Sequence, residues 1–148
     1  MMPFAKVLAI LLALGALWNI SVSSVWAASC DAPTPIKFQR GSSAGIVRGA
    51  VARGEIDCWT FVANAGQIAH VAITSTEKNA VFQIYKPGWK IVRDDDARTA
   101  SGRIFPGTEE GADAKTWSGP LAEGGENLIV VGASRGGADY KLTLEIGK

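Results

Sequence analysis

The chain has 148 residues, enough for one domain with a single hydrophobic core. Its 15 basic and 14 acidic residues nearly balance, and no polybasic stretch is present. This argues against nucleic acid or an anionic membrane as a partner. After residue 28 no apolar run is long enough to predict a membrane span.

Residues 1–28 have the pattern of a secretory signal peptide. Lys6 supplies one positive charge, residues 7–20 are mostly apolar, and Ala27 and the alanine after it offer a cleavage site. The sequence therefore predicts a periplasmic or secreted protein whose mature domain covers residues 29–148.

Both cysteines, Cys30 and Cys58, lie in this exported part. Two cysteines in an oxidising compartment predict a disulfide. The alternative is a lipoprotein with lipid on Cys30. That signal needs a bulky aliphatic residue three places earlier, where Ala27 stands, and it would leave Cys58 without a partner.

Short apolar or alternating runs separated by turn residues predict β-strands along the mature chain. They cover residues 46–51, 57–63, 67–75, 80–86, 128–131 and 140–146. The last run alternates without an error, whereas residues 128–131 are continuously apolar, as in a strand covered on both faces. No helical stripe is present, so we predict an all-β antiparallel sandwich, jelly-roll-like, with about eight strands.

The alternation also predicts the core. The residues expected to be buried together are Phe61, Val71, Ile73, Phe82, Ile84, Leu128, Val130, Leu142 and Leu144. Trp59 and Trp117 are expected in the core as well. Trp89 directly follows a Pro-Gly turn and is expected to be more exposed, where an aromatic ring could stack on a sugar.

Residues 88–115 form the longest expected loop, with a short edge strand possible around 103–105. Its acidic residues could offer oxygen ligands to calcium: Asp94, Asp95, Asp96, Glu109, Glu110 and Asp113. Interleaved arginines are expected to pair with these carboxylates, so we predict a solvated, internally paired loop and no metal site.

Catalytic residues are not apparent in the sequence. The one histidine, His70, falls on the outward parity of its strand. A Ser-His-Asp site needs a histidine in a cleft, and a catalytic zinc site needs three protein ligands. We therefore expect neither an enzyme nor a cofactor.

Several segments resemble the β-sandwich domain similar to the pre-peptidase C-terminal domain of secreted bacterial proteins. They are Trp-Thr-Phe at 59–61, Ala-Gly-Gln at 65–67, Tyr-Lys-Pro-Gly at 85–88, Trp-Ser-Gly-Pro-Leu at 117–121 and the strand at 137–144. Within that group, residues 38–44 and 66–71 look like those of the periplasmic inhibitors of g-type lysozyme. The resemblance covers roughly residues 36–146.

The inhibitors carry a Ser-Gly-x-Tyr motif in a turn that is thought to enter the lysozyme cleft. The matching positions here are Glu123, Gly124, Gly125 and Glu126, of which only Gly124 agrees. The resemblance thus implies a binding site at these four residues, with Trp89 nearby, and a g-type lysozyme as partner. The alternative is an accessory module that binds a carbohydrate or the cell envelope without inhibiting.

Overall fold

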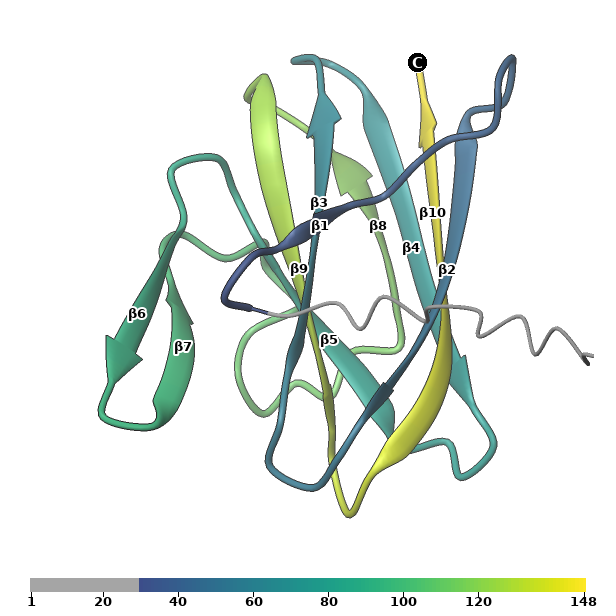
Figure 1. Cartoon of the computed structure of the whole chain (residues 1–148). Coiled ribbons are helices and arrows are strands. Elements are labelled where there is room, and N and C mark those ends of the chain that lie inside the picture. Colours follow the sequence, from purple (N-terminus) through teal and green to yellow (C-terminus); the bar gives the residue numbers. More distant parts are fainter. Residues whose placement is uncertain (1–29) are drawn as a thin grey trace, which may run out of the picture.

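The computed structural model describes residues 30–148, which form ten β-strands and no helix (Figure 1). The predicted signal peptide, residues 1–28, lies outside the described residues. No helix long and apolar enough to cross a membrane occurs between residues 30 and 148.

The strands follow one another in chain order. They are β1 (Thr34–Pro35), β2 (Ala44–Val51), β3 (Asp57–Ala63), β4 (Ile68–Ser75), β5 (Ala80–Tyr85), β6 (Lys90–Asp94), β7 (Ala97–Ser101), β8 (Thr116–Pro120), β9 (Gly125–Ala133) and β10 (Ala138–Gly147). Eight of them build two sheets of four strands, with the orders β1-β3-β9-β5 and β2-β10-β4-β8. The remaining two, β6 and β7, form a separate hairpin.

The two four-stranded sheets face each other, and most strands that follow one another in sequence lie in opposite sheets (Figure 1). All pairings are antiparallel except that of the short β1 with β3. This alternation between sheets is the strand arrangement of a jelly roll. The predicted all-β sandwich is confirmed.

The core follows from strand parity. In β10, Leu142 pairs with Val47 on one side and Ile73 on the other, and its side chain is fully buried. The residue after it, Thr143, points to the outer face and is only partly buried. The period-two pattern of the sequence therefore predicts which side chains of this sheet face the core.

The prediction is wrong for one strand. Ile129 and Val131 of β9 face the other sheet, while Leu128 and Val130 lie on the opposite face, in a second cluster. All four side chains are buried, so the apolar run 128–131 is covered on both faces, as predicted. Because both parities of the run are apolar, the sequence alone does not show which residues face the sandwich.

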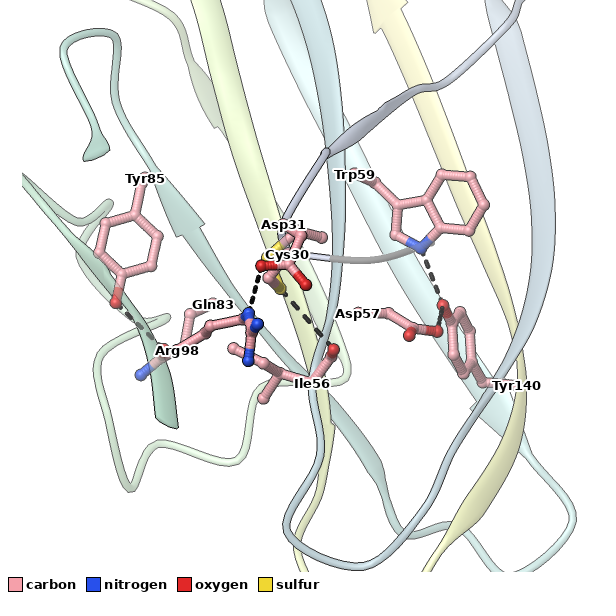
Figure 2. Close-up of a disulfide and its surroundings, with 10 residues drawn as sticks. Cys30, Asp31, Ile56, Asp57, Trp59, Gln83, Tyr85, Arg98 and Tyr140 are labelled. Carbon is pink, nitrogen blue, oxygen red and sulfur yellow. Dashed lines mark hydrogen bonds and ion pairs between the residues drawn. A yellow bond between two sulfur atoms is a disulfide. The ribbon is translucent and has the colours of Figure 1, made fainter. Parts of the chain in front are cut away.

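The predicted disulfide lies in this second cluster. Cys30 is bonded to Cys58 of β3, so the sulfur that the lipoprotein alternative needs is already used (Figure 2). Tyr85, Leu128 and Val130 pack in the same cluster. The bond thus fixes the start of the described chain against the outer face of the β1-β3-β9-β5 sheet.

Where a long loop was expected, β6 and β7 form a hairpin that projects from the sandwich (Figure 1). Asp95 turns the chain with φ 48°, a left-handed conformation that aspartate tolerates. Arg93 and Arg98 pair with Asp31, next to the disulfide, and not with the carboxylates of their own segment. The predicted internal pairing is wrong for these two arginines and for Arg103, which pairs with Glu123 outside the segment.

The expected edge strand at 103–105 is reduced to one bridge between Tyr85 and Ile104. This segment and its neighbours complete the edge of the sandwich beside β5. Among residues 30–148 no group of three or more His, Cys, Asp or Glu side chains is placed to hold a metal ion.

A polar network crosses the core away from these loops (Figure 2). Tyr140 donates to Asp57 Oδ2 at 2.6 Å and accepts from Trp59 Nε1 at 2.8 Å. Burial raises the pKa of Asp57, although the hydrogen bond from Tyr140 opposes this. Gly49 leaves room for the pair, since a Cβ there would lie 2.4 Å from the Tyr140 hydroxyl oxygen.

Candidate functional site

The segment with the predicted binding residues connects the two sheets. β8 ends at Pro120 and β9 begins at Gly125; we call residues 121–126 the β8–β9 turn. Leu121 is 1% exposed and anchors the turn in the core. Its backbone N–H donates to Gln67 and its carbonyl accepts from Gly66, both at 2.7 Å. The turn is therefore fixed to the neighbouring β3–β4 turn by burial and by backbone hydrogen bonds.

Glu123 does not project as a bare carboxylate. Arg103 donates to both of its oxygens, with Nη2 2.7 Å from Oε2, and also donates to the Pro87 carbonyl at 3.0 Å. The hydrogen bond from Arg103 lowers the pKa of Glu123, and the same contact raises the pKa of Arg103. Arg103 thus favours the charged form of the Glu123 carboxylate and balances its negative charge. This pairing was not predicted from the sequence.

The structure places Trp89 beside the turn, as a support and not as an exposed platform. Its indole Nε1 donates to the Glu126 carbonyl at 3.1 Å, and its ring packs against the second cluster. Trp89 is half-buried and so more exposed than the buried Trp59, as expected, but its ring packs against the second cluster and does not form a free platform for a sugar. The Glu126 side chain itself is exposed on the outer face, across from Val62 of β3.

Glycine at one of the four matched positions has a steric cause. Gly125 has φ +135°, and a Cβ there would lie 3.1 Å from Pro87 Cβ. At Gly124 a Cβ would make an ordinary van der Waals contact, 3.4 Å from the Ala65 nitrogen. The turn therefore fits closely between the β3–β4 turn and the β5–β6 connection.

A cavity of about 350 Å³, which the sequence analysis did not predict, opens directly beside the turn. Phe105 and Trp117 form its floor, with ring centroids 4.9 Å apart and planes at 55°. Its other lining residues are Lys86, Pro87, Pro106, Ser118, Gly119, Pro120, Ala122 and Glu123. We call it the edge pocket, because it lies where β8, the last strand of its sheet, meets the segment beside β5.

Charge at the mouth of the edge pocket is positive. Lys86 lies 5.3 Å from the centroid of Phe105 and makes no salt bridge within residues 30–148. Arg103 and Glu123 cancel each other. Lys86, Arg103 and Glu123 together thus leave one net positive charge beside the apolar walls.

His70 lies on the outer face of β4, as its parity predicts, and its Nδ1 is 2.5 Å from Ser118 Oγ. Both side chains are exposed, on paired positions of β4 and β8.

No protein-family model matches the sequence, and no curated protein matches it. The solved structures with a similar fold include three periplasmic inhibitors of g-type lysozyme. Aeromonas hydrophila PliG, a periplasmic lysozyme inhibitor of g-type lysozyme, is 24% identical with TM-score 0.60, over 82% of this chain and 98% of its own. Salmonella Typhimurium PliG is 18% identical with TM-score 0.54, over 78% and 97%. A mutant of Escherichia coli PliG is 22% identical with TM-score 0.51, over 78% and 97%.

These similarities establish the fold. They agree with the inhibitor resemblance seen in the sequence, and the broader pre-peptidase C-terminal resemblance stays a prediction.

Proposed function

We propose that this protein is an exported, non-enzymatic inhibitor similar to the periplasmic inhibitors of g-type lysozyme. It acts by occlusion: the β8–β9 turn and the adjoining loops fill the substrate cleft. The observation that carries the proposal is the fold match over 98% of the Aeromonas hydrophila inhibitor. It is supported by a well-anchored turn at the residues that the sequence resemblance aligns with that family's binding motif.

Rigidity matters because binding costs the entropy of every segment that becomes ordered. Leu121 is buried, Glu123 is held by two hydrogen bonds from Arg103, and the Glu126 backbone is held by Trp89. A turn ordered in this way before binding loses little on entering a cleft.

The electrostatics also suit such a cleft. Glycoside hydrolases use a pair of carboxylates at the scissile bond, and a bare carboxylate on the inhibitor would be repelled there. Arg103 neutralises Glu123, and Lys86 adds a positive charge beside it. Glu126 is the remaining acidic group of the turn, and its side chain points to the outer face, away from the edge pocket.

A carbohydrate- or envelope-binding module is the second candidate. Of the two features that suggested it, Trp89 and the acidic loop, Trp89 is half-buried and packs against the second cluster. The observation in its favour is now the pair of aromatic rings, Phe105 and Trp117, in the edge pocket.

A turbidity assay on peptidoglycan separates these candidates. Mature protein is mixed with g-type, c-type and i-type lysozymes, and binding to isolated peptidoglycan is measured in parallel. We expect slower lysis by g-type enzymes. Restoring the family motif with Glu123→Ser and Glu126→Tyr should strengthen inhibition, because tyrosine is a favoured anchor at interface centres.

If neither the wild-type protein nor the double mutant slows any g-type lysozyme at micromolar concentration, the inhibitor proposal fails. Binding to peptidoglycan in the same experiment would then support the accessory module.

A further inference from the structure

The edge pocket has rigid, apolar walls. Three prolines, Pro87, Pro106 and Pro120, line it around the two aromatic rings. Trp117 Nε1 already donates to the Pro106 carbonyl at 3.0 Å, so its ring offers the pocket carbon atoms and no free donor. Transfer of an apolar group from water into such a pocket is favourable. A ligand made of hydroxyl groups would lose hydrogen bonds to water and find few hydrogen-bond partners there.

Gly119 sets the position of the floor. Trp117 lies over Gly119, and a Cβ at that position would be 2.7 Å from Trp117 Cζ2. Any side chain there would displace the indole ring from its present position. The absence of a side chain at Gly119 thus lets Trp117 take its place in the pocket lining.

The mouth adds a charge preference. Lys86 stands over Phe105 and makes no salt bridge among residues 30–148. Its charge also acts on Glu123, but that carboxylate is already paired with Arg103. An apolar group that carries or adjoins a carboxylate fits both features, because its carboxylate meets Lys86 as the apolar part enters the pocket.

We propose that the edge pocket receives one apolar side chain of the inhibited lysozyme, and that a carboxylate of the enzyme beside that side chain pairs with Lys86. This inference rests on the proposed function. Ala122 and Glu123 belong both to the β8–β9 turn and to the pocket wall, so an enzyme seated on the turn covers the mouth. The carboxylates of a glycosidase cleft complement the charge of Lys86.

The pocket also supplies what the turn lacks. Interfaces of this kind depend on a few anchors buried in well-packed pockets, and the turn has lost the tyrosine of the family motif. Here the anchor would come from the enzyme and the pocket from this protein.

The test measures the dissociation constant of the mature protein for a g-type lysozyme. Ala122→Leu fills the mouth, and Ala112→Leu is its control, at an exposed alanine that does not line the pocket. Lys86→Met removes the charge and keeps the stem, with Lys90→Met on β6 as its control. We expect each pocket variant to weaken binding about tenfold or more and each control to leave it within about twofold. Unchanged melting temperatures establish that the variants fold.

A second measurement does not use the lysozyme. The indole N–H of Trp117 is followed by NMR during titration with 3-phenylpropionate, 3-phenylpropanol and soluble peptidoglycan fragments. We expect a saturable shift with the carboxylate, a weaker one with the alcohol, and loss of the difference in Lys86→Met.

The outcomes are distinguishable. If wild type binds lysozyme and the pocket variants bind as tightly as their controls, the anchor is overturned and the proposed function stands. If wild type binds no lysozyme, both fail, and a Trp117 shift with peptidoglycan fragments would assign the pocket to a glycan instead.

Discussion

Two segments that leave the sandwich, the β8–β9 turn and the β6–β7 hairpin, are each tied back by arginine–carboxylate pairs. Arg103 holds Glu123 of the turn, while Arg93 and Arg98 of the hairpin hold Asp31. All these pairs are exposed, and exposed pairs contribute little to stability. The ion pairs therefore do not distinguish the two segments.

Burial does distinguish them. Leu121, the first residue of the turn, and Asn127, the residue after it, are each 1% exposed, whereas Ala100 is the one buried residue in the two hairpin strands. Local opening is easiest where few buried apolar contacts must break. We expect the turn to open only when the core unfolds, and the hairpin to open separately and more easily. A turn that stays ordered is what the proposed binding element requires.

The largest effect is expected from Phe61, which pairs with Asn127 directly behind the turn and is 2% exposed. Phe61→Ala should lower the free energy of unfolding by about 3–5 kcal/mol, the cost of deleting a packed aromatic side chain. Urea denaturation measures this loss. Hydrogen exchange should show that the exchange rates of the turn amides increase more than those of the hairpin amides.

Val62→Ala is the matched control, because Val62 is the next residue and is 67% exposed. Its cost should stay within about 0.5 kcal/mol. Equal costs for the two variants would mean that the register of β3 is wrong by one residue. Phe61→Leu gives a milder variant should the alanine variant not fold.

Loss of the disulfide should affect the two segments in the opposite way. Replacing Cys30 and Cys58 with alanine should cost about 3.5 kcal/mol by the chain-entropy estimate for a loop of this length. Asp31 then loses its fixed position, so hairpin amides should exchange faster while the turn amides keep their protection relative to global unfolding. Asp31→Asn is the control, since it breaks the ion pairs and leaves the disulfide intact. Equal loosening of turn and hairpin would contradict the comparison.

The strands that the sequence predicts well are those whose two faces differ in polarity. β10 alternates apolar and polar residues without an error, so both its existence and its inward side chains were predicted. In β9 all of residues 128–131 are apolar. The sequence therefore predicts that these side chains are buried, but not which of them face the other sheet. The hairpin was missed because its strands are mostly exposed and carry no apolar alternation.

The site was reached through a resemblance, and its supports were missed for a physical reason. Arg103 lies 20 residues from Glu123 in the chain, and Trp89 lies 37 from Glu126. Pairs this distant are set by the fold and leave no local pattern. The one available signal was chemical: an arginine and a tryptophan in a glycine-rich loop near an acidic turn.

A smaller effect on stability is expected from a change at Asp57. Its hydrogen-bond network lies away from the β8–β9 turn, so the change should leave the turn ordered. Because burial raises the pKa of Asp57 above 3.8, the folded protein binds this proton more tightly than the unfolded chain. Its contribution to stability is complete below pH 3.8 and decreases as pH rises through the folded pKa. Asp57→Asn still accepts from Tyr140, so it should flatten this dependence and cost less than about 1 kcal/mol at neutral pH. Denaturation across acidic pH measures it, and an unchanged slope would contradict the buried assignment.

The smallest effect concerns the ion pair of the turn itself. Arg103 lowers the pKa of Glu123 below 4.5, so the pairing is present above that pH and is lost as pH falls through the folded pKa. The NMR titration midpoint of the Glu123 carboxyl should therefore lie below 4.5, and Arg103→Gln should raise it toward that value. The difference should shrink in about 1 M salt, where exposed charges are screened within roughly 3 Å. Throughout the titration the turn amides should stay protected, because Leu121 and not the ion pair keeps the turn in place. A turn that opens when Glu123 is protonated would show that the arginine, and not the core, orders the proposed binding element.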